Sequence, residues 1–298
     1  MYEAHFGLRE LPFRITPDTS FAFAGRQHQN ALNTLIVAVH NLEGFIKITG
    51  EVGAGKTLLC RRFLAACAPD CATGYLPNPF LEPRALLLAI ANELALSLPA
   101  DIDQHQIHNA LTLGLLALAR AGKNVVLCID EAQAMPIETL ETLRLLTNLE
   151  TEKRKLIQVV LFGQPELDER LADPRVRQLR QRIAFQFHLG NLAADEAGHY
   201  LEHRLRVAGH GGGEVFAPPA VRALHRRAGG LPRLMNILAH KSLMLAYGEG
   251  VYMVQARQVN TAARDTPAAA GSFGPLRWLS GAAASFAAAA GFAGARRP

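Results

Sequence analysis

The sequence predicts a parallel α/β fold built around a phosphate-binding loop and followed by a smaller helical domain. Gly50–Thr57 fits the pattern G-x-x-x-x-G-K-[ST] in full, between an expected strand and an expected helix. Four further apolar runs have the length and composition of buried strands. Past residue 190 these strand patterns end, and helical periodicity continues alone. A nucleotide-binding sheet domain with a helical appendage follows from these three observations.

Composition sets bounds on the function. The 298 residues are 49% hydrophobic and 19% charged, which is typical of a globular chain of about two domains. The formal charge of +5 is modestly basic, and an anionic nucleotide accounts for part of it. Lys153–Lys155 is the one tight basic run of the folded region and is typical of a solvated loop, whereas nucleic-acid surfaces are usually denser. Nucleic acid is therefore a disfavoured partner that composition does not exclude.

The cysteines and the N-terminus indicate the compartment. Cys60, Cys67, Cys71 and Cys128 have no metal-ligand spacing, and Cys60 and Cys128 fall in apolar core patterns. Residues 1–6 have neither the basic nor the apolar region of a secretory signal. We expect a reducing, cytoplasmic setting.

The expected elements follow the chain in alternation. Residues 1–30 are rich in aromatic residues and turn formers, and two interpretations stay open: an arm over the nucleotide base or a packed arm without ligand contact. The expected strands cover 45–49, 73–76, 124–129, 156–163 and 183–189. The expected helices of this half cover 27–41, 58–66, 83–96, 104–121 and 137–151.

The phosphate loop carries the first chemical prediction. Its glycines allow the backbone to wind around a triphosphate, with N–H groups and the helix N-terminus facing the anion. Lys56 is expected to reach the β- and γ-phosphates, and the Thr57 hydroxyl to ligate Mg²⁺. The expected nucleotide-binding residues are Gly50, Glu51, Val52, Gly53, Ala54, Gly55, Lys56, Thr57 and Leu58.

Two further strand ends carry polar residues. Asp130 and Glu131 follow the buried run 124–129, and the carboxyl edge of a parallel sheet places them beside the loop. Such a pair alone could be a solvated turn, but with a complete phosphate loop we expect Asp130 at Mg²⁺ and Glu131 polarising the attacking water. Gln164 follows the run 156–163 and could contact the γ-phosphate and that water; the alternative is a turn-forming amide before Pro165.

Arginines mark two other positions. Arg175, Arg177, Arg180 and Arg182 lie close together before the last expected strand. They form either a solvated charged face or an arginine finger for the γ-phosphate of a neighbouring subunit. In the helical half, Arg233 follows Pro232 at the start of an expected helix 231–247 and could swing onto the phosphates. The other helices there are expected over 194–208, 218–228 and 254–263.

The chain resembles the AAA+ ATPases of the ExeA/GspA type, and among them the protein of MSHA pilus biogenesis. The resemblance covers roughly residues 1–262. It is carried by Tyr2…Phe6-Gly7-Leu8…Pro12-Phe13, Gly44–Thr57, Ile129–Gln133, Gly163–Leu167, Leu179–Ile183 and Gly230–Asn236. The resemblance implies a five-stranded parallel sheet of the additional-strand, catalytic-glutamate class with a helical lid.

The resemblance also implies roles. It makes Lys56 and Thr57 the Walker A pair, Asp130 and Glu131 the Walker B pair, Gln164 the sensor 1 position and Arg233 the sensor 2 position. Gln164 departs from the asparagine usual in AAA+ proteins. For the finger, Arg182 is preferred and Arg180 comes second. We expect an α/β domain with its arm over residues 1–190, a lid over 191–263 and an Ala/Gly-rich tail over 264–298.

The implied function is Mg²⁺-dependent ATP hydrolysis by a ring-like homo-oligomer. It would drive or regulate assembly of a type IV (MSHA-type) pilus or a type II secretion machine, with inner-membrane proteins as partners. ExeA/GspA proteins continue into a peptidoglycan-binding region, so we expect no periplasmic activity of these 298 residues. The uncharged run 278–295 leaves a membrane span, a surface or partner helix, and disorder open, so weak or peripheral membrane association is expected. The alternatives are a DNA-transaction ATPase, as in transposition helpers, and a nucleotide switch with negligible turnover.

Overall fold

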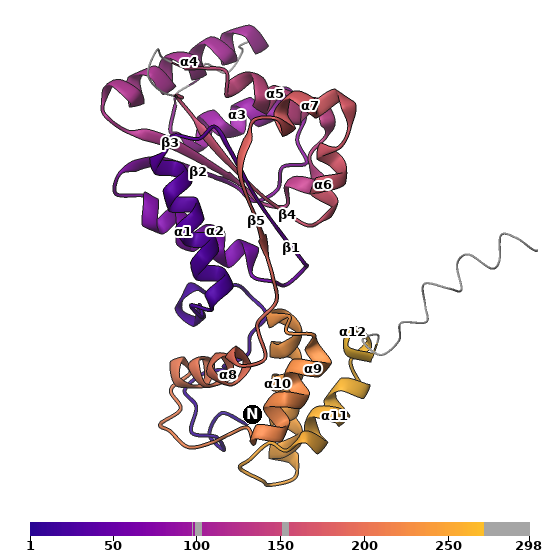
Figure 1. The fold of residues 1–298 in the computed structure, drawn as a ribbon. Coiled ribbons are helices and arrows are strands. Elements are labelled where there is room, and N and C mark those ends of the chain that lie inside the picture. The colour runs from indigo at the N-terminus through magenta and orange to yellow at the C-terminus, as the bar shows by residue number, and fades with distance from the viewer. Residues whose placement is uncertain (97, 99–102, 151–154, 271–298) are drawn as a thin grey trace, which may run out of the picture.

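The computed structural model describes residues 1–96, 98, 103–150 and 155–270 (Figure 1). Lys153 and Arg154 of the expected basic loop lie outside the described residues, as does the tail beyond residue 270 with its uncharged run. In the ranges that are described, no helix is both long and apolar enough to cross a membrane.

Five strands form one sheet, in the order β2-β3-β4-β1-β5, and every neighbouring pair is parallel. The predicted five-stranded parallel sheet is therefore confirmed. The strands are β1 (Phe45–Gly50), β2 (Cys71–Leu76), β3 (Asn124–Ile129), β4 (Gln158–Gly163) and β5 (Ile183–Leu189).

Helices cover both faces of this sheet, which explains why its central strands bury apolar residues on both faces rather than on one. Side chains from even-numbered positions such as Ile46 and Val160 pack with α1 and α2 on one face. Those from odd-numbered positions such as Val159 and Leu161 pack with the other helices on the opposite face. The helices are α1 (Arg26–His40), α2 (Lys56–Cys67), α3 (Pro83–Glu93), α4 (Gln104–Arg120), α5 (Ile137–Leu146), α6 (Glu166–Leu171) and α7 (Arg177–Arg180). All four cysteines are buried free thiols.

One expected helix is shorter than predicted. Periodicity extended it from residue 137 to 151, but α5 ends at Leu146. Thr147 caps it and is itself buried, with its hydroxyl donating to the carbonyl of Arg144 at 2.9 Å. The chain beyond it forms an antiparallel bridge between Glu150 and Lys155, which helical periodicity alone does not reveal.

Because the strands are parallel, their carboxyl ends lie together along one edge of the sheet and their amino ends along the opposite edge. Thr49 of β1 lies beside Gly163 of β4, and Leu161 of β4 lies beside Ile129 of β3. The ends of these three strands therefore lie at one edge of the sheet, where β1 leads into the phosphate loop, β4 into Gln164 and β3 into Asp130. At the opposite edge, Phe45 lies beside Ile183, where β5 begins.

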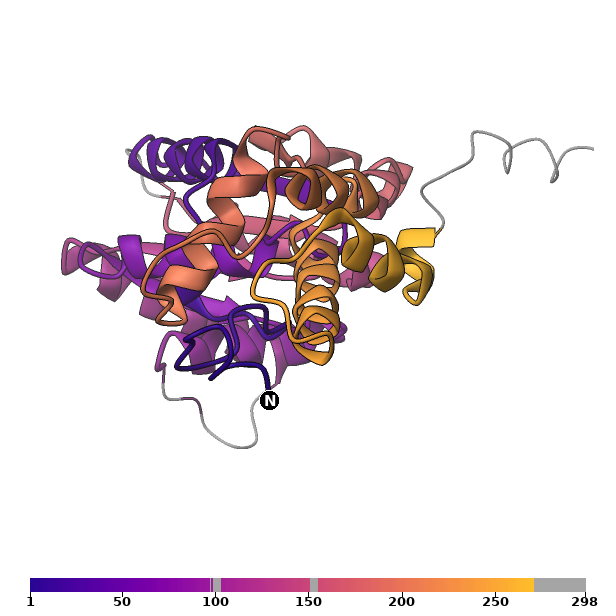
Figure 2. The same ribbon diagram turned by 90° about the horizontal axis from the view of Figure 1, so that it is seen from below.

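A group of helices with its own hydrophobic core follows β5 and lies apart from the sheet (Figure 1). Tyr2, Phe6, Phe13 and Phe21 are buried in this same core, and both views place the start of the chain beside these helices (Figure 2). The N-terminal arm thus packs against the C-terminal helices, whereas the sequence predicts it as part of the sheet domain. Its contact with a nucleotide base stays a prediction. The helices are α8 (Glu196–Val207), α9 (Pro218–Ala228), α10 (Pro232–Gly248), α11 (Ala256–Arg264) and α12 (Pro267–Ala270).

Candidate nucleotide site

The phosphate loop connects β1 to α2 with a backbone that requires glycine. Gly53 and Gly55 have φ of 84° and 101°, in the left-handed region that other L-residues occupy only at a cost. At Gly50, a Cβ would lie 2.8 Å from the carbonyl oxygen of Leu189 in β5. No side chain caps the N-terminus of α2, which follows directly. The loop therefore presents backbone N–H groups in the way that suits an anion.

Lys56 is buried at the first position of α2, with 5% of its surface exposed. Its Nζ donates to the carbonyl oxygens of Gly50 at 2.7 Å and of Glu51 at 3.0 Å. Burial lowers the pKa of Lys56, while the carboxylates of Glu131 and Asp130 oppose that shift. The ammonium is held beside the loop, where phosphate oxygens would be stronger acceptors than neutral carbonyls.

Thr57 and Asp130 form the part of the site that fits a metal ion. The Thr57 Oγ1 donates to Asp130 Oδ2 at 2.6 Å, and the Tyr75 hydroxyl donates to the same oxygen at 3.4 Å. Asp130 is 3% exposed. A hydroxyl and a carboxylate are the hard oxygen donors that Mg²⁺ prefers, and their contact places both within reach of one ion. These two residues thus suit the predicted Mg²⁺ site.

Glu131 is held by two glutamine amides. Its Oε2 accepts hydrogen bonds from Gln133 Nε2 at 2.6 Å and from Gln164 Nε2 at 3.0 Å. Burial alone would raise the pKa of Glu131, but these hydrogen bonds and the charge of Lys56 outweigh it and place the pKa below its ordinary value. The carboxylate is therefore ionised at neutral pH, as a general base must be.

Gln164 lies where the sequence placed it, at the tip of the strand next to the acidic one. Its side chain contacts Glu131, and its backbone N–H donates to Gln133 Oε1 at 3.0 Å. These bonds join the tips of β3 and β4. Its predicted contact with a γ-phosphate stays a prediction.

Arg233 lies against the loop, at the start of α10. Its backbone N–H donates to the carbonyl oxygen of Gly53 at 3.3 Å. A Cβ on Gly53 would come within 2.5 Å of the Arg233 Cβ, so only glycine permits this contact. The Arg233 side chain is exposed. The helical region therefore contacts the phosphate loop directly, while the role of the guanidinium stays a prediction.

His28 of α1 contacts the loop from another direction. Its Nε2 would lie 2.6 Å from a Cβ on Gly55, and its ring bonds to the backbone of Ala54. Burial lowers its pKa, so the imidazole is neutral at neutral pH. The sequence patterns do not reveal the contacts of His28, Tyr75 and Gln133 with the site. Only Gln133, two residues after Glu131, had a signal, because it lies within the motif that carries the resemblance.

The two candidate finger arginines lie away from this site. Arg180 and Arg182 precede β5, whose first residue is at the opposite edge and whose last residue, Leu189, pairs with Gly50. Six steps along a strand correspond to about 20 Å. Arg182 Nη1 donates to the carbonyl oxygen of Arg144 at 3.5 Å. Neither guanidinium therefore reaches the loop of its own chain.

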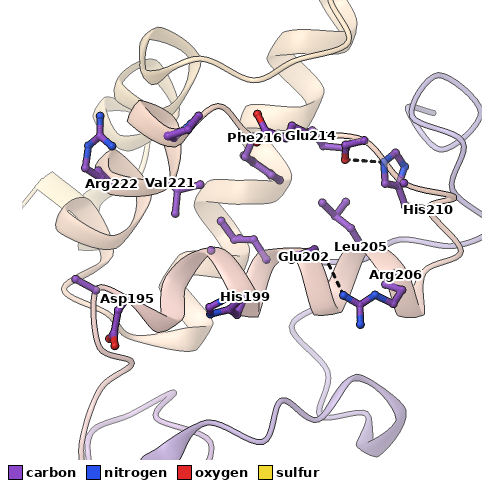
Figure 3. Close-up of a pocket in the computed structure, with 17 residues that line it drawn as sticks. Asp195, His199, Glu202, Leu205, Arg206, His210, Glu214, Phe216, Val221 and Arg222 are labelled. Atoms are coloured by element: carbon purple, nitrogen blue, oxygen red, sulfur yellow. Dashed lines mark hydrogen bonds and ion pairs between the residues drawn. The ribbon is translucent and has the colours of Figure 1, made fainter.

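Arg180 instead lines a small polar cavity of about 290 Å³ together with Lys47 and Asp168, which pair with each other. A larger groove of about 710 Å³ lies between α8 and α9 (Figure 3). Its wall includes Leu205 and the ion pair of Glu202 with Arg206, and none of its lining residues belongs to the loop or the strand tips. Neither hollow is part of the nucleotide site.

Comparisons with known proteins agree with this geometry. Residues 39–171 match the model of an AAA domain. The chain is 40% identical over 263 residues to the General secretion pathway protein A of Aeromonas hydrophila. The aligned region covers 88% of this chain and 48% of that protein. It thus spans about half the length of that curated relative.

Solved structures show the same fold at low identity. Cdc6p from Pyrobaculum aerophilum has a TM-score of 0.62 at 18% identity and covers 84% of this chain and 71% of its own. The ORC2 protein of Aeropyrum pernix has a TM-score of 0.60 at 17% identity, covering 83% and 71%. The fold is that of an α/β P-loop NTPase with C-terminal helices. The AAA-domain match and the 40% identical relative show that the chain is similar to proteins of the ExeA/GspA type.

Proposed function

We propose that this chain binds ATP between the phosphate loop and the tips of β3 and β4, and hydrolyses it. One observation carries the proposal: the Glu131 carboxylate, held by two amides, and the hydrogen-bonded Thr57–Asp130 pair lie together with Lys56 at the carboxyl ends of the strands. Preorganised groups of this kind need little rearrangement during the reaction, which is how electrostatic catalysis gains its advantage.

Each residue has a distinct part in this proposal. The loop N–H groups and Lys56 hold the β- and γ-phosphates, and Thr57 and Asp130 hold Mg²⁺. When bound, Mg²⁺ neutralises charge that develops on the phosphate oxygens. Glu131 takes a proton from the attacking water, and Gln164 orients that water. Arg182, or else Arg180, acts on the γ-phosphate of a neighbouring copy, and Arg233 joins the phosphates from the lid.

The energy of hydrolysis is used, we propose, to drive or regulate assembly of a type II secretion machine or of a type IV pilus of the MSHA type. The 40% identical relative named General secretion pathway protein A supports this purpose. A homo-oligomer at the cytoplasmic face of the inner membrane, with inner-membrane assembly proteins as partners, is part of the proposal. So is its division into a sheet domain that ends near residue 190 and a lid over 191–263, against which the N-terminal arm packs.

Turnover by the purified chain tests the activity. We expect Mg²⁺-dependent release of phosphate from ATP, and loss of that release in Glu131→Gln although ATP still binds. Rapid turnover in both proteins would contradict the proposed role of Glu131. Negligible turnover in both, with ATP bound, would instead favour a nucleotide switch.

Replacement in the organism that encodes the chain tests the purpose. We expect Glu131→Gln to abolish secretion or surface pili, whereas Gln178→Met, at an exposed position of α7, leaves both unchanged. Normal secretion and normal pili in the Glu131 variant would contradict the proposed purpose.

Turnover measured with and without duplex DNA distinguishes the proposed assembly function from the DNA-transaction alternative. The neighbours of known structure are under 25% identical and support the fold alone, so they do not favour a DNA substrate. We expect turnover to be unchanged by DNA. Stimulation of several-fold with a steep dependence on salt would favour the alternative instead.

A further inference from the structure

Gln133 bridges the tips of two strands through a single side chain. It lies in the 3₁₀ turn Ala132–Ala134, directly after the acidic pair. Its Nε2 donates to Glu131 Oε2 at 2.6 Å, and its Oε1 accepts from the backbone N–H of Gln164 at 3.0 Å. An ionised carboxylate only accepts and a backbone N–H only donates, so these two partners allow one orientation of the amide.

Both amide donors act on the same carboxylate oxygen of Glu131. Gln133 and Gln164 each donate to Oε2, and a carboxylate oxygen has two lone pairs. The two amide donors thus match the two lone pairs of Oε2. Proton transfer from water consequently falls to Oε1.

The backbone of Glu131 makes such support necessary. Its φ of 52° and ψ of 37° are left-handed, a conformation that is uncommon for a residue with a long side chain. Strained backbone of this kind persists only where surrounding contacts hold it. The Asp130 Oδ1 accepts the Glu131 N–H at 3.0 Å, which ties the main chain, and Gln133 ties the side chain.

We propose that Gln133 is a positioning residue for hydrolysis: it fixes the Glu131 carboxylate with Oε1 toward the attacking water and links it to Gln164. The inference rests on the proposed ATPase function. It differs from the part given to Gln164, because Gln133 acts through Glu131 and through the backbone of Gln164. The three residues form a closed circuit of three hydrogen bonds, and removing Gln133 breaks two of them.

Gln133→Met tests this role, because methionine has nearly the length of glutamine and no amide. We expect kcat to fall by about 10- to 100-fold, within the range that a positioned general base contributes, while the KM for ATP changes less than about threefold. The loss of a donor to the carboxylate raises the pKa of Glu131, so the acid limb of the kcat profile moves to higher pH. Gln178→Met on α7 is the matched control and should change neither.

A second measurement does not depend on turnover. With the glutamate carboxyl carbons labelled by ¹³C, the Glu131 resonance is the one missing from Glu131→Gln, and its pKa is read by NMR titration without ATP. We expect a higher pKa in Gln133→Met than in the wild-type chain. The thermal midpoint, measured on the same samples, shows whether the variant is folded.

Each outcome decides one of the two proposals. Wild-type kcat and an unmoved acid limb in Gln133→Met would overturn the positioning role. A lower kcat accompanied by a loss of ATP affinity of similar size would also overturn it, because a merely structural effect gives that pattern. A wild-type chain without turnover would overturn the proposed function instead, while the NMR titration would still decide whether Gln133 acts on Glu131.

Discussion

The two edges of the sheet carry charged residues in opposite ways. At the carboxyl edge, Thr57 contacts Asp130, and Glu131 contacts Gln164, at 3.0 Å or less. At the amino edge, Arg180 and Arg182 are exposed, and Arg182 donates to the carbonyl oxygen of Arg144. The difference indicates that one chain prearranges the acids and the phosphate loop. The arginines of the other edge are remote from that loop, and their proposed role therefore requires a neighbouring copy of the chain.

Replacing the preferred finger arginine should produce the largest effect. We expect Arg182→Ala to lower turnover by about 10³-fold at protein concentrations that support an oligomer, since an arginine finger stabilises transition-state charge to that extent. Affinity for ATP should be unchanged, because the residue is remote from its own loop. Arg120→Ala, an exposed arginine at the end of α4, is the matched control. Full turnover in both Arg182→Ala and Arg180→Ala would contradict the claim that the amino edge supplies an arginine to a neighbouring site.

Replacing the base at the carboxyl edge should have the next largest effect. Glu131→Gln keeps the size of the side chain and removes the proton acceptor, so we expect turnover to fall by about 10²-fold or more. ATP should still bind, because Glu131 does not contact the loop residues that hold phosphate. Phosphate release and equilibrium ATP binding, measured on one preparation, would show whether the loss lies in chemistry alone.

Sequence was most informative at the carboxyl edge. The order of strand, loop and helix fixes the position of Lys56, and parallel pairing brings Asp130 and Gln164 to the same edge, so local patterns were sufficient. The contacts of His28, Gln133 and Arg233 could not be derived in this way, because they depend on how separate elements meet in space. The packing of the N-terminal arm against the C-terminal helices could not be derived for the same reason.

The contact between loop and lid offers a smaller and more specific test. Gly53→Ala introduces a Cβ within 2.5 Å of Arg233, so α10 or the loop must move, and we expect about tenfold weaker ATP binding. Gly122→Ala is the matched control: its φ of 80° imposes similar backbone strain, but nothing lies within 4 Å of the added Cβ. Both variants should lose about 1–2 kcal/mol of stability. Equal ATP affinity in the two would show that the lid contact does not shape the loop.

The smallest effect is expected where the helical region caps α1. Glu196 Oε1 accepts the backbone N–H of Arg26 at 2.7 Å, and the carboxylate is largely buried. We expect Glu196→Ala to lower the free energy of unfolding by about 1 kcal/mol, the usual cost of a lost helix cap. Asp195→Ala removes an exposed pair with the same arginine and should cost less. Urea unfolding would rank the two, and the reverse order would contradict this account of the junction.

A mixing experiment tests the central claim that each site is completed by a second copy of the chain. Glu131→Gln retains its arginines, and the double variant Arg180→Ala/Arg182→Ala retains its acids, so each lacks what the other supplies. We predict that the mixture hydrolyses ATP well above the sum of the separate variants, and increasingly so as protein concentration rises. Turnover equal to that sum at every concentration would contradict the claim.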